Sequence, residues 1–410
     1  MLSYLPFYQA YQFANDMLDP IRSLAQATAS TYGVLLPKSK AALPAKIMLA
    51  GCEMFDFGKL THESPPFNIN KVKVGRRSAV VTEEVVSSTP FCELLHFRKN
   101  IKQPQPKILV VAPMSGHFAT LLRNTVETLL QDHDVYITDW LNVRDIPLED
   151  GEFGLDDYVE HIINFLAFLG EDSHLLAVCQ PSVPALVAAA VMAEDKHPAQ
   201  PRSMTLMAGP IDTRINPTVV NELATDKPIE WFERTVVGTV PSQFAGSGRR
   251  VYPGVLQIAA FMGMNPKRHL QAFAKMFANI VKENHADVQF TRDFYEEYFA
   301  IMDLSAEFYL ETVYKVFQDY QLAKGTLEYR GRTVKPELIK HTALFTVEGE
   351  RDDICALGQT LAAQDLCKGL HPYKKLHHMQ AGVGHYGVFS GRRWQTEVYP
   401  MVRDFILQWE

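Results

Sequence analysis

The chain has 410 residues, of which 47% are hydrophobic and 21% charged, a composition typical of a folded globular protein. Its formal net charge of -7 argues against nucleic acid as the main partner, because nucleic-acid-binding surfaces are usually basic. Five scattered cysteines fit neither a metal-ligand spacing nor a disulfide framework, which favours free thiols in a reducing cytoplasm. We find no apolar run of the ~20 residues that a membrane span needs. The start of the chain also lacks the basic region and cleavage site of a signal peptide.

Residues 1–69 are predicted to form an N-terminal helical extension. Apolar side chains recur there at roughly helical spacing, namely Leu2, Leu5, Tyr8, Phe13, Met17, Ile21 and Leu24. Such a helix could pack on the body of the protein or across a homo-oligomer. It could also lie on an apolar surface such as a lipid or polymer particle. Its low basic content does not favour an anionic membrane. Residues 34–68 are interpreted as a loop with a helix near 42–58.

Three segments then alternate apolar and polar residues, as half-exposed antiparallel strands do. They span residues 71–74, 78–88 and 92–99.

Near-continuous apolar runs follow, and helical stretches separate them. The strands are expected at 107–114, 134–140, 174–179 and 203–210, with helices at 118–131, 155–169 and 183–195. The same alternation resumes late in the chain, with strands at 343–350 and 373–379 and helices at 356–367 and 393–409. Buried parallel strands that alternate with helices predict a mostly parallel, doubly wound α/β sheet.

The intervening residues 213–335 are helical and rich in aromatic side chains. At about 120 residues, this segment is far longer than an ordinary connection. We therefore expect a helical cap (lid) between core strands 6 and 7, over a core made of residues 70–212 and 336–410. The cap aromatics could line a substrate channel or form a core of their own; they are Trp231, Phe232, Phe261, Phe294, Tyr295, Tyr298, Phe308 and Tyr309.

Cys179 ends an apolar strand and directly precedes a helix. A nucleophile at such a sharp strand-to-helix turn projects above the strand tips in the α/β-hydrolase fold. Ala177 and Pro181 stand where the G-x-S-x-G motif has glycines, so the motif itself is weak here. The alternative is a buried structural cysteine, which is the usual state of this residue type.

His385 follows the last predicted core strand in a glycine-rich loop, GVGHYG. A general base must approach the nucleophile closely, and a glycine-rich loop permits this better than a helix interior. His371, His377 and His378 lie nearby in the sequence and could compete for this role.

The third residue of a triad would be a carboxylate that orients the histidine. It lies among Glu348, Glu350, Asp352 and Asp353, just past a predicted strand. Spacing alone does not choose between them, and Asp212 is a second-rank candidate. The chain order of nucleophile, acid and histidine is that of the α/β-hydrolases.

An oxyanion hole needs two backbone N–H groups near the nucleophile. The N–H of Gln180, the residue after Cys179, is one candidate donor. The second is expected from the loop after the first parallel strand, from Met114 or Ser115. That loop could instead be a turn chosen for Gly116.

Several long motifs resemble those of the intracellular poly(3-hydroxybutyrate) depolymerases, a family related to the polyhydroxyalkanoate synthases. They cover almost the whole chain and include PMSGHFATLLRNTVETLL, VCQPSVPAL, AGPIDTRINPTVVN, GRRVYPGVLQ, VEGERDDI and GHYGVFSGRRW. The resemblance implies a cysteine nucleophile at Cys179, the first aspartate of D-D-I (Asp352) as the acid, and His385 as the base. It further implies hydrolysis of amorphous polyester in cytoplasmic storage granules, with release of 3-hydroxybutyrate oligomers or monomer, and no metal or organic cofactor.

Two other functions stay open. Polyhydroxyalkanoate synthases use the same three residue types, so a synthase-like acyltransferase or a thioesterase acting on 3-hydroxyacyl-coenzyme A is one alternative. Synthases typically have G-x-C-x-G and D-H-I, whereas this chain has A-V-C-Q-P and D-D-I. A non-enzymatic granule-binding protein is the other alternative.

Overall fold

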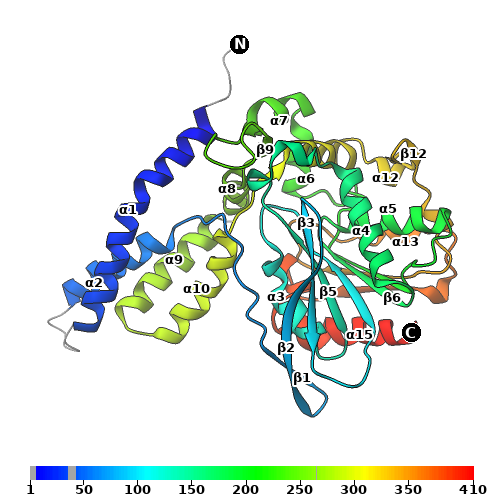
Figure 1. Cartoon of the computed structure of the whole chain (residues 1–410), viewed down its shortest axis with the longest axis horizontal. Coiled ribbons are helices and arrows are strands. Elements are labelled where there is room, and N and C mark those ends of the chain that lie inside the picture. Colours follow the sequence, from blue (N-terminus) through cyan, green and yellow to red (C-terminus); the bar gives the residue numbers. More distant parts are fainter. Residues whose placement is uncertain (1–5, 36–42, 265) are drawn as a thin grey trace.

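The protein is built around one nine-stranded sheet, seen in a computed structural model that describes residues 6–35, 43–264 and 266–410. The order across the sheet is β1-β2-β3-β5-β4-β6-β7-β13-β14 (Figure 1). Its strands are β1 (Lys71–Val74), β2 (Arg77–Ser88), β3 (Cys92–Lys99), β4 (Lys107–Val111), β5 (Asp134–Trp140), β6 (Ser173–Val178), β7 (Ser203–Met207), β13 (Ala343–Gly349) and β14 (Lys375–Gln380).

The two halves of the sheet differ in direction and in burial. Strands β1, β2 and β3 pair antiparallel, and β3 also runs antiparallel to β5. From β5 onward every pairing in this sheet is parallel. All residues of β6, β7 and β13 are buried, because helices cover both faces of the parallel part. This explains why their sequences are continuously apolar, whereas β2 alternates.

Helices cover both faces of the parallel strands. α3 (Arg123–Leu129) and α15 (Tyr399–Gln408) contact each other on one face, and α4 (Leu155–Leu169) and α5 (Ser182–Glu194) contact each other on the opposite face (Figure 1). The strand order, the crossing of β4 and β5, and the helices on both sides define an α/β-hydrolase fold, as the sequence predicts. β1 is a short edge strand, so β7 and β13 are the sixth and seventh strands counted from β2.

The cap enters the fold between β7 and β13. Its helices are α6 (Val219–Asp226), α7 (Ile229–Val236), α8 (Gly254–Met264), α9 (Pro266–Val281), α10 (His285–Phe299), α11 (Ala306–Thr312) and α12 (Gln321–Lys324). It also contains two small antiparallel sheets that the sequence analysis did not foresee. Their strands are β8 (Gly238–Thr239), β9 (Arg250–Tyr252), β10 (Leu304–Ser305), β11 (Glu328–Tyr329) and β12 (Arg332–Thr333). Strands of two or three residues are too short to carry a recognisable alternation.

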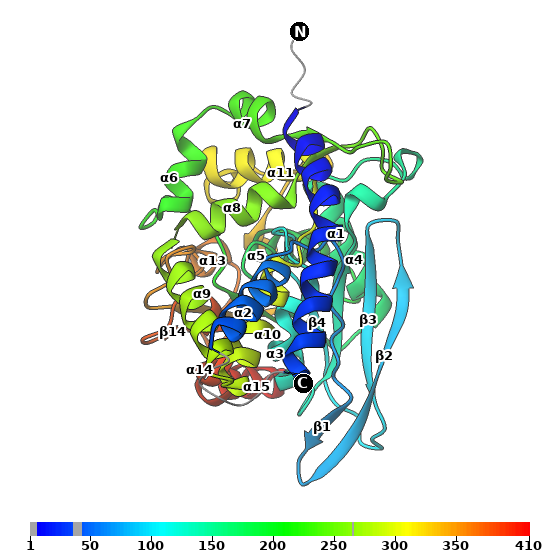
Figure 2. The same ribbon diagram turned by 90° about the vertical axis from the view of Figure 1, so that its left-hand side faces the viewer.

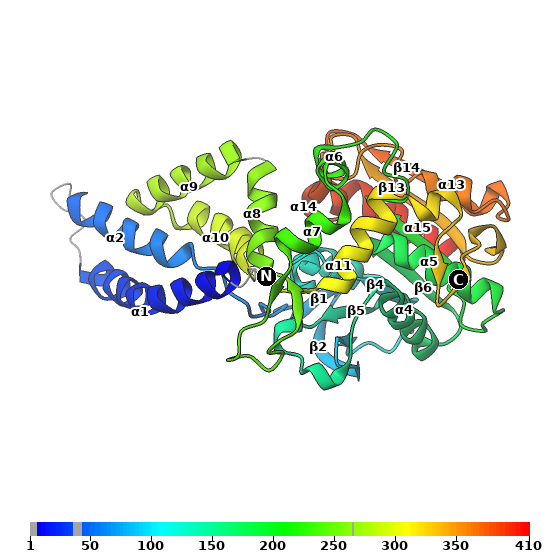
Figure 3. The same ribbon diagram turned by 90° about the horizontal axis from the view of Figure 1, so that it is seen from above.

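Four helices project from one side of the core (Figures 1 and 3). They are α1 (Pro6–Leu35), α2 (Leu43–Phe57), α9 and α10, and we call them the helical arm. Figure 2 looks onto α1 and α2 from outside, with the sheet behind them. Phe57 at the end of α2 packs with Tyr295 and Phe299 of α10, so the N-terminal helices and the cap share a small hydrophobic cluster. Tyr8 of α1 also hydrogen-bonds the buried Asp303.

Two predicted elements differ from the structure. The helix expected at 356–367 is shorter, since α13 comprises only Ala362–Leu366. The last helix is interrupted, with α14 at Gly391–Arg393 and a π-helical turn at Trp394–Val398 before α15. The predicted N-terminal helix is present from residue 6, and Leu2 and Leu5 lie outside the described residues. The predicted domain limits at residues 69, 212 and 335 stay a prediction.

Candidate active site

Cys179 lies at a sharp turn between β6 and α5, and its backbone is strained. Its φ is 69°, in the left-handed region that residues other than glycine seldom adopt. The turn is held by the Cys179 N–H, which donates to the Met207 carbonyl at 2.7 Å, and by the Ser182 N–H, which donates to the Cys179 carbonyl at 3.0 Å. Strain of this kind persists where surrounding contacts enforce it, and it is frequent at active sites. The thiol side chain is half-buried.

Gly209, at the end of β7, lets the neighbouring chain approach this turn. A Cβ atom at this position would lie 2.1 Å from the Ser182 side chain and 3.1 Å from the Cys179 carbonyl oxygen. Any larger residue would therefore displace the turn. The sequence analysis missed this position, although a glycine directly after a buried strand could have indicated a close backbone approach.

His385 and Asp352 form a buried pair beyond the ends of β14 and β13. The distance from His385 Nδ1 to Asp352 Oδ2 is 2.8 Å, and both residues are less than 10% exposed. The other carboxylate oxygen, Oδ1, accepts the N–H groups of Ile354 and Cys355 at 2.9 and 2.8 Å. These contacts fix the carboxylate and leave Nε2 as the ring nitrogen available to a nucleophile.

The charges around His385 favour its protonated form. Burial alone would lower its pKa, but the Asp352 carboxylate and the Cys179 sulfur, by charge and by hydrogen bonds, raise it well above the ordinary value. The His385 ring is thus hydrogen-bonded to Asp352, and Cys179 lies close enough to influence its pKa. A cysteine and a histidine in such contact can exist as a thiolate–imidazolium pair, which is the reactive state of a cysteine nucleophile.

The other candidate acids have different partners. Asp212 binds the Arg214 guanidinium through both oxygens, at 2.8 and 2.7 Å. Glu350 is exposed and accepts the N–H of Gly382 at 2.6 Å. Asp353 is exposed, and the hydrogen bond to His385 comes from its neighbour.

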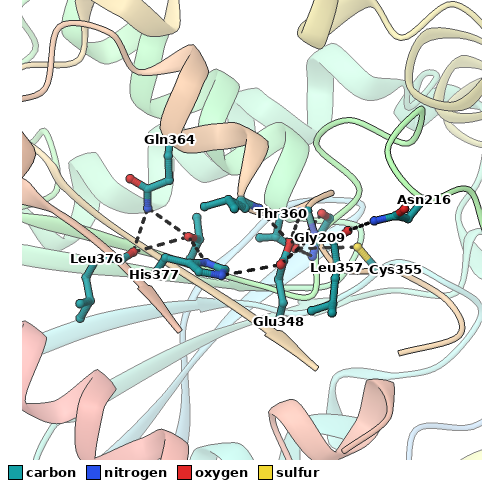
Figure 4. Close-up of polar contacts among 12 residues, drawn as sticks. Gly209, Asn216, Glu348, Cys355, Leu357, Thr360, Gln364, Leu376 and His377 are labelled. Atoms are coloured by element: carbon teal, nitrogen blue, oxygen red, sulfur yellow. Dashed lines mark hydrogen bonds and ion pairs between the residues drawn. The ribbon is translucent and has the colours of Figure 1, made fainter. Parts of the chain in front are cut away.

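Glu348 is buried at the end of β13 and supports the loop that carries Asp352. Its carboxylate accepts the N–H groups of Gly358, Thr360 and Leu361 at 2.8 to 3.0 Å. Figure 4 shows Glu348 beneath this loop, with the Thr360 side chain between it and Gly209. The Thr360 hydroxyl donates to the Gly209 carbonyl at 3.0 Å and accepts the Gly209 N–H at 2.8 Å. The acid loop and the nucleophile turn are thereby tied together.

The rival histidines lie away from this pair. His377 is on β14, 3.0 Å from the Thr346 hydroxyl, and its Nε2 atom is 3.8 Å from Glu348 (Figure 4). His378 contacts the Gln380 side chain at 2.9 Å, and His371 stacks on Tyr373.

Met114 and Ser115 lie on the loop after β4, beside the turn at Cys179. In the described part of the chain, no hydrogen bond is found from the backbone N–H of Met114, Ser115 or Gln180. The following Gly116 has a φ of +85°, and a Cβ there would lie 2.1 Å from the Gln257 side chain of α8. The glycine is thus needed for the turn and for the approach of the cap, while the preceding N–H groups remain available as donors.

Two buried aromatic residues hydrogen-bond the backbone just before this loop. The Trp140 indole N–H and the Tyr158 hydroxyl both donate to the Ala112 carbonyl, at 2.9 and 2.8 Å. Both are almost fully buried, and they fix the backbone just before Met114.

Two cavities meet at the candidate site. An apolar cavity of about 240 Å³ reaches Cys179, Gln180, Met114 and Ser115, and we call it the acyl cavity. A second cavity of about 260 Å³ reaches His385, and we call it the polar vestibule. Phe261, Met264 and Ile354 line both. The thiol and the imidazole therefore lie where the two cavities adjoin.

The cap aromatics divide between these cavities and the protein interior. The acyl cavity is lined by Phe232, Phe261, Phe308 and Tyr309, and the vestibule by Phe261, Phe294 and Tyr298. Tyr295 is buried in the hydrophobic cluster between α2, α9 and α10, and Trp231 is exposed.

Comparison with known protein families assigns the chain to one of them. Residues 208–410 match the family model described as "PHB de-polymerase C-terminus". The matched half contains Asp352 and His385, whereas Cys179 lies before it. The chain belongs to the PHB depolymerase family. Family membership makes it an ester hydrolase; which ester it cleaves is taken up as a proposal below.

Solved structures with similar folds are distant in sequence. An α/β-hydrolase from Penicillium sp. sh18 is 15% identical with a TM-score of 0.46, over 80% of this chain and 98% of that one. A meta-cleavage product hydrolase from Pseudomonas fluorescens IP01 is 17% identical with a TM-score of 0.43, over 79% and 98%. A monoacylglycerol lipase from Paleococcus ferrophilus is 12% identical with a TM-score of 0.43, over 75% and 97%. No curated protein sequence matches the chain.

Among the helices that the structure describes, none combines the length and the apolar character needed to cross a membrane.

Proposed function

We propose that this PHB depolymerase family member hydrolyses ester bonds of amorphous poly(3-hydroxybutyrate) through a Cys179–His385–Asp352 triad. The observation that carries the proposal is the strained turn at Cys179, which opens onto a cavity adjoining that of His385, an imidazole that Asp352 holds at 2.8 Å. Family membership supports the polyester as substrate.

Acylation begins when the Cys179 thiolate attacks the carbonyl carbon of a backbone ester, forming a C–S bond. The negative charge that develops on the carbonyl oxygen is stabilised by the N–H of Gln180 and by one N–H from Met114 or Ser115. Collapse breaks the C–O bond, and the His385 imidazolium transfers its proton to the departing alkoxide. The hydroxyl-bearing product leaves, and an acyl thioester remains on the sulfur.

Deacylation needs a water molecule activated by the now neutral His385. The imidazole takes a proton from water as the oxygen attacks the thioester, and Asp352 stabilises the imidazolium that forms. The C–S bond breaks, the carboxylic acid leaves, and the thiolate–imidazolium pair is restored. Besides the ester, the cycle consumes only water.

Attachment to the storage granule is assigned to α1. Four of its apolar side chains recur at helical spacing and are 55 to 68% exposed, namely Phe13, Met17, Ile21 and Leu24. We call them the α1 stripe. An uninterrupted exposed stripe of large apolar side chains is a feature of surfaces that bind an apolar phase. The only basic side chain of α1 is Arg22, which favours an uncharged polyester over an anionic membrane.

The test is release of 3-hydroxybutyrate from amorphous polyester particles by the wild type and by Cys179→Ala. We expect the variant to lose at least about 10³-fold in rate, since removal of a nucleophile eliminates the covalent route. Cys52→Ala is the matched control, because Cys52 lies on α2 away from the site, and this variant should retain wild-type rates. Release of 3-hydroxybutyrate by Cys179→Ala at the wild-type rate would refute the proposal.

Incubation of the same proteins with 3-hydroxybutyryl-coenzyme A distinguishes the hydrolase from the acyltransferase alternative. Free 3-hydroxybutyrate from the polyester, with no chain growth from the thioester, is the expected result. Growth of polymer from the coenzyme A ester would instead assign a synthase-like activity.

A further inference from the structure

The polar vestibule differs from the acyl cavity in its charged lining. Arg268 of α9 and Arg351, from the loop after β13, both line it together with His385, and Asp353 is the one carboxylate among its lining residues. The acyl cavity, by contrast, has no charged side chain among its lining residues. An ester entering the site would therefore meet an apolar environment beside the thiol and two guanidinium groups beside the imidazole.

The two guanidinium groups outnumber the one carboxylate, that of Asp353, that lines the vestibule. Both are exposed at the mouth of the cavity. The backbone of Arg351 is held by its N–H, which donates to the Val383 carbonyl at 2.8 Å. Burial lowers the pKa of His269 and raises the pKa values of Tyr298 and Tyr386, which also line the vestibule. The positive charge of Arg268 reaches all three: it adds to the lowering at His269 and opposes the rise at the two tyrosines. The vestibule thus presents a net attraction for anions close to the reacting atoms.

The direction of the ester follows from the proposed chemistry. The acyl half of the substrate becomes bonded to the sulfur and occupies the acyl cavity. The leaving half receives its proton from His385 and so lies on the vestibule side. In a poly(3-hydroxyalkanoate), the leaving half is the one that ends in the free carboxylate of the chain. The anionic end of the substrate therefore points toward the two arginines.

We infer that Arg268 and Arg351 bind the terminal carboxylate of the polyester chain, so that the enzyme cleaves esters close to that end. The guanidinium group suits this role, because its planar donors match the two oxygens of a carboxylate. The consequence is release of short hydroxy acids, one or a few units long, from the carboxyl terminus. This inference rests on the proposed function. It adds the orientation of the bound polyester chain and the end from which the chain is cleaved.

The experiment compares a 3-hydroxybutyrate trimer that has a free carboxylate with its methyl ester. These two substrates share every internal ester and differ only in the terminal charge. We expect the wild type to prefer the free acid by about tenfold in kcat/KM, the effect of one well-formed charged hydrogen-bonded contact. In Arg268→Gln/Arg351→Gln the ratio should fall to near one, and each single variant should lie between. The preference should reside in KM, because the arginines act in binding.

Arg76→Gln is the matched control, since Arg76 is exposed in the β1–β2 turn and distant from the site. Thermal unfolding of each variant shows whether the fold is kept, and the single variants serve where the double variant does not fold. An unchanged preference in the folded arginine variants would overturn the inference, as would equal cleavage of both substrates by the wild type. Failure of the wild type to cleave either substrate would instead contradict the proposed function.

A phosphate is the other anion that two arginines could bind, and 3-hydroxybutyryl-coenzyme A tests it. We expect turnover of this thioester to respond no more to the double substitution than turnover of the methyl ester does. A tenfold loss confined to the coenzyme A ester, with the trimer ratio unchanged, would overturn the carboxylate assignment.

Discussion

The candidate active site and the α1 stripe differ in whether their side chains are held by contacts with the rest of the protein. At the site, backbone hydrogen bonds and buried carboxylates fix each side chain: Asp352 is held by two N–H groups and Glu348 by three. On the arm, the α1 stripe leaves four large apolar side chains exposed, with nothing in the described chain covering them. A protein that only had to be stable would bury those side chains.

Under the proposed function, chemistry and attachment therefore reside in separate parts of the molecule. Changes at the site should affect every ester, soluble or particulate. Changes in the α1 stripe should affect only a substrate that has a surface. The predictions below test this separation, from the largest expected effect to the smallest.

Asp352→Asn should lower kcat about 10³- to 10⁴-fold on soluble and particulate esters alike. The amide can no longer stabilise the imidazolium and can select the wrong tautomer, as in other triads. Asp353→Asn, one residue along the loop, is the matched control and should lose far less. The rates are measured on the 3-hydroxybutyrate trimer and on amorphous particles. If Asp353→Asn were the more damaged of the two, the acid assignment would be wrong.

Phe13→Ser/Ile21→Ser should weaken binding to amorphous polyester particles by at least about tenfold, because each large apolar side chain contributes about 1.5–3 kcal/mol when buried. Cosedimentation with particles measures the binding, and trimer hydrolysis should be unaffected. Phe168→Ser/Leu407→Ser removes two similarly exposed apolar side chains from helices of the core and is the control. Equal losses in the two double variants would mean that the α1 stripe has no special role.

Glu348→Gln should lower the free energy of unfolding by about 1–3 kcal/mol, because an amide N–H₂ then faces backbone N–H groups that need an acceptor. Glu350→Gln should cost less, since that exposed side chain accepts a single N–H. Chemical denaturation measures both. Activity should fall with stability in Glu348→Gln, because the loop that carries Asp352 loosens. A Glu348→Gln protein as stable as the wild type would show that these contacts do not hold the loop.

The stability contributed by His385 should depend on pH. Its pKa in the folded protein is raised above the ordinary value of about 6.5, so the folded state binds the proton more tightly than the unfolded state does. This contribution is fully present below about pH 6.5 and is lost as the pH rises through the raised pKa, at up to about 1.4 kcal/mol per pH unit. The unfolding free energies of the wild type and His385→Gln, compared between pH 6 and pH 9, should therefore converge with rising pH. A difference that does not vary with pH would contradict this.

The sequence predicted the core well, for a physical reason. Strands buried on both faces, such as β6 and β13, are mostly apolar, and the turns after them carry many of the polar groups that reach the sheet edge. The positions of Cys179 and His385 after core strands could therefore be predicted from the sequence pattern. The choice among Glu348, Glu350, Asp352 and Asp353 could not be made, because four carboxylates within six residues differ only in the direction in which each points.

Other features depended on contacts between distant segments. The helix expected at 356–367 starts later because Gly358, Thr360 and Leu361 donate their N–H groups to Glu348. The helical arm joins α1 and α2 to cap helices more than 200 residues away, which no local pattern encodes. The two arginines of the vestibule come from the cap and the core, and they line one cavity only in the folded chain.

The most direct test of the central claim is to trap the acyl-enzyme. Protein mixed with the 3-hydroxybutyrate trimer is quenched in acid during turnover, digested, and examined by mass spectrometry. We predict a hydroxyacyl group on the peptide that contains Cys179, removable by hydroxylamine, and its absence from Cys179→Ala. An acyl group on any other residue, formed at the rate of turnover, would contradict the account.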